Sequence, residues 1–341
     1  MEKRPFGQTS LSVSPLTLGG LFTSDLGGGV DATVETLTRA FDLGINFIDT
    51  APAYANSEET LGKALKRVTN VPDDLVISTK FGGRPQPFDP QDKAGLTYSI
   101  EESLRLLGRE SVEILIIHEP DRPQQYPWWT DPANVEGPVL EVMDTLKQQG
   151  KIQYTGLGGT TVNEMHHFVA SGKFDVLLCA FNYSLLYREA ALEVLPEAQV
   201  QGMGVMLGSV LQQGGLAKRY DEELKTKPVW MSAKRHKQFL TLYQLLDETG
   251  LSLPELAIRF TAAHPAVSTV LLGTSKASHL EAGVRDIEKG PLPDDLVDRL
   301  NEIAAMVPYR PFEEPQVLPI GKPYFGPGMS NLGEGIQVGK L

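Results

Sequence analysis

The stretch GINFIDTAPAYANSEETLGKAL, at residues 44–65, is the part of the chain that most limits how it can fold. An apolar run ends at Asp49, an irregular connection carries Tyr54, and a helix is predicted to begin near Ser57. The order strand, loop, helix is typical of α/β barrels, which carry their chemistry in the loops that follow the strands. Asp49 and Tyr54 are therefore candidate active-site residues.

The next two apolar runs also end in titratable side chains. Residues 75–79 lead into Lys80, and residues 112–117 lead into His118. Because parallel strands of a barrel end at the same face, we expect these two side chains to lie near Asp49. Taken singly, each residue type has an ordinary structural use. Their repetition at three successive strand ends favours a functional site.

Strand and helix patterns alternate in eight units, and 341 residues with 41% hydrophobic content suffice for one large core. Barrels of ~250 residues plus insertions fold as one domain. We predict an α/β fold, a (β/α)8 TIM barrel with long active-site loops over residues 1–306, and a C-terminal extension, a Pro- and Gly-rich arm, at 307–341. The predicted strands are 14–18, 45–49, 75–79, 112–117, 151–157, 174–179, 204–207 and 267–272. The predicted helices are 32–43, one from 57, 93–107, 137–149, one from 161, 187–200, 232–249, 254–263 and 275–284.

The segments FIDTAPAY, STKFG and IIHEPD, in this order, resemble the aldo-keto reductase superfamily. The resemblance covers about residues 17–284. It implies that Asp49, Tyr54, Lys80 and His118 are the catalytic tetrad of an oxidoreductase. The segments FNYSLL and GSVLQQGGL look closer to the branch that includes L-galactose and L-fucose dehydrogenase, which implies a small carbonyl or sugar substrate.

The residue types of the tetrad suit carbonyl reduction. Hydride transfer to a carbonyl carbon leaves charge on oxygen, so Tyr54 can donate the proton. Free tyrosine has a pKa of ~10, and a cation at ~4 Å in a dielectric of ~20 is worth roughly 4 kcal/mol. Lys80 is therefore expected to lower the pKa of the phenol into the physiological range. Asp49 would keep Lys80 charged, and His118 would position the carbonyl oxygen.

The resemblance also implies NADP or NAD, with NADP favoured, bound across the C-terminal face of the barrel without a Rossmann GxGxxG motif. The loop after the eighth strand resembles the family's phosphate site, since a helix N-terminus with a nearby cation holds phosphate. The implied cofactor-binding residues are Asp49, Asn182, Ser209, Gly273, Ser275, Lys276 and His279.

Four contacts to the coenzyme depart from the family pattern, which leaves the choice between NAD and NADP open. They concern the nicotinamide amide, the ring that stacks on nicotinamide, and the adenine. The departing positions are Gly158-Gly159 for Ser-Asn, Ala180 for Gln, Gly208 for an aromatic residue, and Ala282-Gly283 for Glu-Asn.

Composition limits the remaining classes. A net charge of -12 argues against a nucleic-acid surface. The single cysteine, Cys179, lies in an apolar run and favours a buried structural thiol over a reactive one. With no signal peptide pattern and no run near ~18 apolar residues, we expect a cytoplasmic protein without a membrane span. No His, Cys, Asp or Glu cluster has metal-ligand spacing, so no metal is expected.

Two loops and the arm are expected to shape the pocket. They are residues 81–89, the loop with Trp128 and Trp129, and residues 307–341. The tryptophan loop is either a pocket wall or a packed lid. The arm packs either on its own barrel, across the pocket mouth, or on a neighbouring subunit of a homo-oligomer. Its aromatic residues are Tyr309, Phe312, Tyr324 and Phe325.

Three functions remain open from the sequence. The first is an NAD(P)-dependent oxidoreductase that interconverts an aldehyde, ketone or sugar with an alcohol, Tyr54 being the proton donor. The second is an aldose 1-dehydrogenase that oxidises a sugar lactol to a lactone. The third is a non-catalytic, coenzyme-binding regulatory subunit like the potassium-channel beta subunits.

Overall fold

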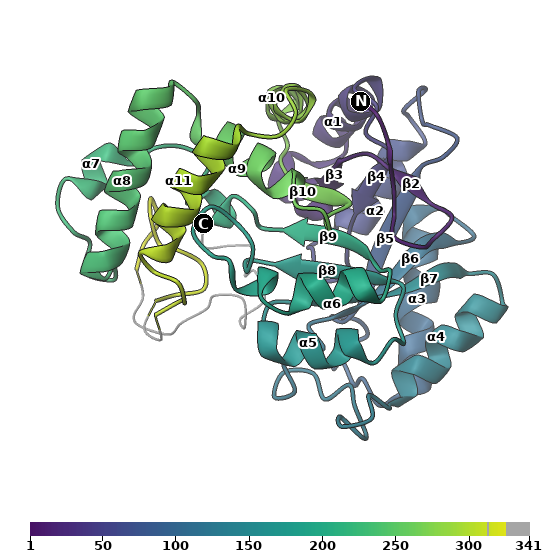
Figure 1. Cartoon of the computed structure of the whole chain (residues 1–341). Helices are drawn as coiled ribbons and strands as arrows, with labels where there is room; N and C mark the ends of the chain where they lie inside the picture. The colour runs from purple at the N-terminus through teal and green to yellow at the C-terminus, as the bar shows by residue number, and fades with distance from the viewer. Residues whose placement is uncertain (312–313, 325–341) are drawn as a thin grey trace.

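The centre of the molecule is a closed barrel of eight parallel strands (Figure 1). The structure, a computed structural model, describes residues 1–311 and 314–324. The strand order around the barrel is β10-β3-β4-β5-β6-β7-β8-β9. Closure leaves no barrel strand with an unpaired edge. The strands are β3 Leu16–Gly19, β4 Phe47–Asp49, β5 Val76–Phe81, β6 Val112–His118, β7 Ile152–Gly159, β8 Val176–Ala180, β9 Gly204–Gly208 and β10 Thr269–Gly273.

Helices cover the outside of the barrel, which confirms the predicted (β/α)8 TIM barrel (Figure 1). Helix α3 shows how the sequence sets such a boundary. The side chain of Asp92 accepts a hydrogen bond from the Ala94 amide at its start, and Gly108 takes a left-handed conformation at its end. The helices of the ring are α1 Gly29–Asp42, α2 Ser57–Leu65, α3 Lys93–Leu107, α4 Pro138–Gln148, α5 Val162–Ala170, α6 Val194–Val200, α9 Leu253–Ala262 and α10 Ala277–Glu288.

Several elements lie outside the eight repeated units. The hairpin of β1 Arg4–Pro5 and β2 Ser12–Val13 brings the buried Phe6 against Phe47, with ring centroids 5.6 Å apart. Helices α7 Asp221–Leu224 and α8 Ala233–Thr249 are inserted between β9 and α9, and α11 Asp294–Ala305 packs against α8 (Figure 1). The hairpin and α11 are absent from the elements predicted from sequence.

The helix predicted at 187–200 is shorter in the structure. It begins only at Val194, after a 3-10 turn at Glu189–Ala191. The preceding segment folds back instead, because the Ala190 amide donates to the backbone oxygen of Asn182 at 3.1 Å. Pro196 fits this start, since a proline without an N–H is tolerated in a first helical turn.

Alternation along the strands brings the predicted site residues to the barrel axis. The barrel interior contains Phe47 on β4, Val76 on β5 and Ile116 on β6. Side chains two residues apart in a strand share a face. Asp49 therefore follows Phe47 on the inner face, and His118 follows Ile116. Lys80 stands four residues beyond Val76 on that face.

The described part of the C-terminal arm packs on its own chain. Leu318 and Ile320 are fully buried. Glu314 pairs with the buried Arg235 of α8 at 2.7 Å. At the other end, the Gly321 amide donates to Glu223 at 2.7 Å. Of the arm residues named above, Phe312 and Phe325 lie outside the described residues.

Candidate active site

Asp49 and Lys80 form a buried ion pair at the mouth of the barrel. Nζ of Lys80 donates to the two carboxylate oxygens of Asp49 at 2.7 and 2.8 Å, and to the backbone oxygen of Thr50 at 2.8 Å. The hydroxyl of Ser78 donates to Oδ1 of Asp49 at 2.7 Å. Burial opposes the charge on Lys80, but Asp49 and Tyr54 outweigh it, so the pKa of Lys80 is raised. The lysine is therefore a fixed cation at neutral pH.

The ring of Tyr54 lies beside this ion pair. Nζ of Lys80 is 4.7 Å from the ring centroid, and the ring of His118 meets it edge to face at 5.9 Å. Burial raises the pKa of the phenol, Lys80 lowers it and Asp49 raises it, and the net direction is upward. The prediction that Lys80 brings this pKa into the physiological range is wrong, because burial and the Asp49 carboxylate outweigh the ammonium. Tyr54 is protonated at neutral pH.

His118, the last residue of β6, is a neutral imidazole. Burial, together with the charges of Lys80 and Arg122, lowers its pKa to about 3. Its backbone oxygen accepts a hydrogen bond from Nε1 of Trp128 at 3.1 Å. A neutral imidazole can donate one N–H to a carbonyl oxygen. The four residues of the expected tetrad thus lie in one cluster.

Backbone strain is concentrated around the same mouth. Among the described residues, those other than glycine with positive φ all lie in loops that follow barrel strands. Three of them come directly after the ends of β6, β8 and β9. Such conformations cost about 1–3 kcal/mol each and cluster at functional sites. The residues are Ala55, Glu119, Val135, Phe181, Ser209, Gln212 and Gln213.

The tryptophan loop after β6 is packed against the protein. Trp128 is fully buried, with ring centroids 5.4 Å from Phe88 and 5.9 Å from Tyr126. Trp129 turns toward α5, where its ring lies 5.1 Å from that of Phe168. Of the two readings left open by the sequence, the packed one describes the tryptophans. Phe88 and Tyr126 are partly exposed.

Four of the expected cofactor residues lie between the last residue of β10 and the first turn of α10. Gly273, Lys276 and His279 are exposed, and Ser275 is partly buried. The hydroxyl of Thr274 accepts from the Lys276 amide at 3.0 Å and bonds Nδ1 of His279 at 2.9 Å. The first turn of α10 has no acidic residue and no side-chain cap. Its amide groups and the Lys276 ammonium therefore suit an anion.

Asn182 lies in the loop after β8, and Ser209 directly follows β9, the strand that pairs with β10. The Asn182 amide donates to the backbone oxygens of Thr160 at 2.6 Å and Ala180 at 3.0 Å, so its N–H groups are already engaged. Ser209 follows β9 with a φ of 55°. At the neighbouring inward position, a Cβ on Gly208 would lie 3.3 Å from that of Ala180. This half of the mouth is lined by small residues.

The departure at Gly159 has a packing cause. A Cβ there would lie 2.1 Å from the sulfur of Met165 and 2.9 Å from Oδ1 of Asp121. Oδ2 of Asp121 accepts from the amides of Thr160 and Thr161 at 2.8 and 2.6 Å. Side chains of other elements thus fill the space that a larger residue would need.

Sequence reasoning missed three polar residues of the loop after His118. They are Glu119, Asp121 and Arg122, and all three are at least partly buried. The segment IIHEPDR carried the available signal: three charged residues placed within four positions of a strand end. The sequence gives no sign that they turn toward one another.

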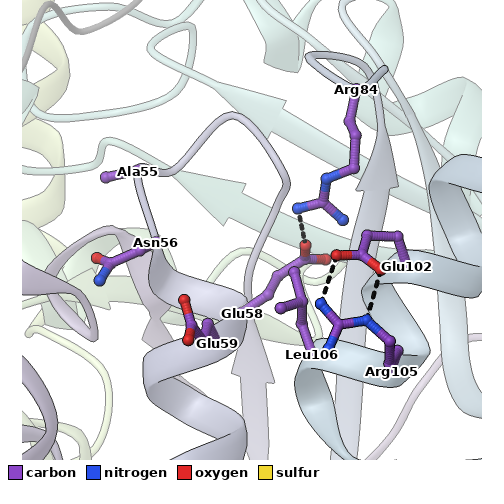
Figure 2. A pocket seen from close by; sticks show the side chains of 8 residues that line it. All are labelled: Ala55, Asn56, Glu58, Glu59, Arg84, Glu102, Arg105 and Leu106. Atoms are coloured by element: carbon purple, nitrogen blue, oxygen red, sulfur yellow. Dashed lines mark hydrogen bonds and ion pairs between the residues drawn. The ribbon is translucent and has the colours of Figure 1, made fainter. Parts of the chain in front are cut away.

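A separate cavity, of about 340 Å³, lies beside the loop that carries Tyr54. Figure 2 shows four of its charged groups in two pairs, Arg84 with Glu58 and Arg105 with Glu102, which are 2.7 and 2.6 Å apart; a fifth, Glu59, pairs with Lys63 outside the cavity. Glu58 also accepts from the hydroxyl of Thr79 at 2.6 Å. None of the four tetrad candidates lines this cavity, so we assign its charges to holding the end of β5 in place.

The fold is that of a TIM barrel, with a cluster of titratable side chains at the mouth. The Aldo/keto reductase family matches residues 17–305, and the chain belongs to this family. It is 30% identical to L-galactose dehydrogenase of Arabidopsis thaliana, over 83% of this chain and 87% of that protein. D-threo-aldose 1-dehydrogenase of a Pseudomonas species is 26% identical, over 73% and 81%. The holo form of aldo-keto reductase AKR11C1 from Bacillus halodurans has a TM-score of 0.72 and 26% identity, covering 91% and 98%.

Across 1–311 and 314–324, no three His, Cys, Asp or Glu side chains gather to hold a metal ion. No helix in these ranges is long and apolar enough to cross a membrane. Cys179 is buried, and burial raises the pKa of its thiol to about 12.

Proposed function

We propose that the protein interconverts a small carbonyl compound and an alcohol with NADP or NAD as coenzyme, Tyr54 being the proton donor. The observation that carries this proposal is the arrangement of Lys80. Its ammonium is held by Asp49 and the Thr50 carbonyl and lies 4.7 Å from the Tyr54 ring. A fixed cation there favours negative charge on the phenol after proton transfer.

The chain's groups suit a coenzyme that supplies or accepts hydride when bound. The exposed first turn of α10, with Gly273, Ser275 and Lys276, would hold phosphate. His279 would add a further polar contact. A cation there favours the extra phosphate of NADP over NAD. Asp49, at the end of β4, would contact the coenzyme where it crosses the barrel axis. Ser209 and Asn182 would border the nicotinamide half.

The residues that handle the proton have separate tasks. The Tyr54 phenol, protonated at neutral pH, gives its proton to the substrate oxygen during reduction. Neutral His118 donates an N–H to the same oxygen and orients it. Lys80 stabilises the resulting phenolate, and Asp49 keeps the lysine charged. In alcohol oxidation the phenolate takes the proton back.

A sugar substrate is the first choice within this proposal. The similarity to L-galactose dehydrogenase, which spans most of both chains, supports it. In that case the reaction oxidises the lactol hydroxyl at C1 to a lactone. The regulatory-subunit alternative has less support, because each tetrad residue is present and in contact with the next.

The test compares wild type, Tyr54→Phe and the control Tyr98→Phe, whose ring is 52% exposed on α3. With L-galactose and NADP+ or NAD+, and with short aldehydes and NADPH or NADH, Tyr54→Phe is expected to lose about 10²–10⁴-fold in kcat. Coenzyme binding, followed by fluorescence, stays unchanged. Turnover by Tyr54→Phe near that of Tyr98→Phe would overturn the proposed mechanism. Coenzyme binding without turnover in wild type would favour the regulatory alternative.

A further inference from the structure

Glu119 presents a carboxylate with unused acceptor capacity next to His118. Its side chain is 13% exposed and accepts no hydrogen bond from any residue in the described ranges. Its nearest charged partner is Nη1 of Arg122, at 3.4 Å from Oε1. A carboxylate has about four lone-pair sites, so most of this capacity is free.

The backbone of Glu119 is held in an uncommon conformation. Its φ is 54°, in the left-handed region that a glutamate seldom occupies. The surrounding structure fixes it there, because the Glu119 amide donates to the Gly158 carbonyl at 2.7 Å and its own carbonyl accepts from the Arg122 amide at 3.2 Å. Strain of this kind is retained where the surrounding structure imposes it, often at functional sites.

Arg122 is fixed by groups other than Glu119. Its Nη2 donates to Oγ1 of Thr160 at 2.7 Å and to Oε1 of Gln316 in the arm at 3.3 Å. Nη1, the atom that faces Glu119, makes no hydrogen bond within the described residues. The pair therefore has one free donor and one free acceptor side by side.

Charge at this place disfavours an anionic ligand. Glu119 and Arg122 cancel each other, and Asp49 cancels Lys80. Asp121 adds one negative charge: its Oδ2 accepts from two backbone amides, while its buried Oδ1 has no hydrogen-bond partner within the described residues. The pKa of Glu119 is raised, because burial and the charge of Asp121 outweigh the opposite effect of Arg122. A second negative charge next to this carboxylate is therefore disfavoured. A hydroxyl, which donates and accepts at once, matches the free pair better than an anion or a cation.

We propose that Glu119 and Arg122 bind a substrate hydroxyl on the carbon next to the reacting carbon, so that Glu119 is a specificity-determining residue for polyhydroxylated substrates. Glu119 follows His118 directly at the end of β6, and its partner Arg122 is anchored to Thr160 directly after β7, which places the pair beside His118 at the mouth of the barrel. This inference rests on the proposed function for the position of the reacting carbonyl.

The kinetic test pairs a change in the enzyme with a change in the substrate. Wild type, Glu119→Gln and the exposed control Glu110→Gln are assayed with hexoses, their 2-deoxy counterparts and an unsubstituted short-chain aldehyde. Because a hydrogen bond to a charged group is worth up to ~100-fold, Glu119→Gln is expected to lose about 10–100-fold in kcat/KM on hexoses, mainly through KM. It should stay within about threefold of wild type on the other two substrates. Equal losses on all substrates, or no loss on hexoses, overturn the inference.

A binding measurement keeps the inference testable if turnover is not found. Galactitol has the hydroxyls but no reacting carbonyl, and its binding to the full chain is followed by calorimetry in the presence of NADP+. Binding that weakens about 10-fold or more in Glu119→Gln but not in Glu110→Gln supports the inference even if the proposed function fails. Galactitol binding that is absent in wild type, or equal in both variants, overturns it. Thermal unfolding of each variant separates these outcomes from loss of fold.

Discussion

The ammonium of Lys80 lies between both carboxylate oxygens of Asp49, at 2.7 and 2.8 Å, and each side chain is only 1% exposed. Removing one partner of such a pair leaves the other charge buried without compensation, which costs about 3–5 kcal/mol. The Lys80 charge that the proposed proton transfer uses therefore also affects the free energy of unfolding.

Asp49→Asn is expected to lower the free energy of unfolding by about 3–5 kcal/mol, because the buried Lys80 ammonium loses the counter-charge that offsets its burial. The double variant Asp49→Asn/Lys80→Met should lose less than the sum of the single variants. Urea denaturation measures each value. The exposed pair of Glu59 and Lys63 is the control, where Glu59→Gln should cost no more than about 0.5 kcal/mol. Additive losses at the buried pair would contradict its coupling.

The raised pKa of Tyr54 gives the two reaction directions opposite pH responses. Reduction needs the protonated phenol, which is present at neutral pH, so its kcat should be level from pH 6 to about 8. Oxidation needs the phenolate, so its kcat should increase with pH through this range and beyond. Stopped-flow or steady-state profiles in both directions check this. An oxidation rate that is already at its plateau at pH 7 would mean that the bound ligands lower the pKa of Tyr54.

The pKa of His118 makes the fold sensitive to acid. The folded value of about 3 is below the ordinary 6.5, so the unfolded chain binds this proton more readily. The stability contributed by the neutral imidazole is present above pH 6.5 and is lost as the pH falls toward 3. At pH 4 the loss is up to roughly 3 kcal/mol. His118→Gln should show a smaller drop in unfolding free energy between pH 7 and pH 4 than wild type, and an equal drop would refute the assignment.

Lys276 offers a direct test of the proposed phosphate contact. Lys276→Ala should weaken NADPH binding about 5- to 50-fold by removing one charge-assisted contact, and weaken NADH binding less. Fluorescence titration measures both. Lys237→Ala, at an exposed position of α8, is the control. Equal weakening of both coenzymes would place Lys276 at the shared pyrophosphate and remove the argument for NADP.

The sequence predicted those features that depend on local periodicity along the chain. Strand alternation carries Asp49, Lys80 and His118 to the inner face, and the strand-end pattern is visible in the sequence. The eight units follow from the same alternation of strand and helix. Both results depend on residues close together in the chain.

The rest depended on contacts between distant segments. The pKa of Tyr54 is set by burial, which residue types alone do not reveal. The space at Gly159 is closed by Met165 and Asp121, which lie on other elements. Glu119 takes a positive φ that nothing in its residue type predicts. These features shape the site, and the strand and helix pattern of the sequence does not predict them.

Glu314 holds the arm to the rest of the chain through a largely buried cluster, and this gives the last prediction. Its carboxylate pairs with Arg235, and it accepts from the hydroxyl of Tyr187, whose ring lies between Arg235 at 4.6 Å and Arg310 at 3.7 Å. Glu314→Gln leaves the Arg235 guanidinium buried with an uncharged partner, so the free energy of unfolding should fall by about 3 kcal/mol or more.

The arm contacts the candidate site through Gln316, whose side-chain oxygen accepts a hydrogen bond from Arg122. Release of the arm should therefore also change the kinetic constants. Glu314→Gln should become more sensitive to proteolysis after residue 307 and should raise KM for hexoses, because Arg122 loses one of its anchors. Glu222→Gln, which removes an exposed pair with Lys225, is the control for both measurements. If KM is unchanged while proteolysis increases, the arm stabilises the barrel without shaping the pocket. If both change together, the buried cluster at Glu314 positions the arm for substrate binding.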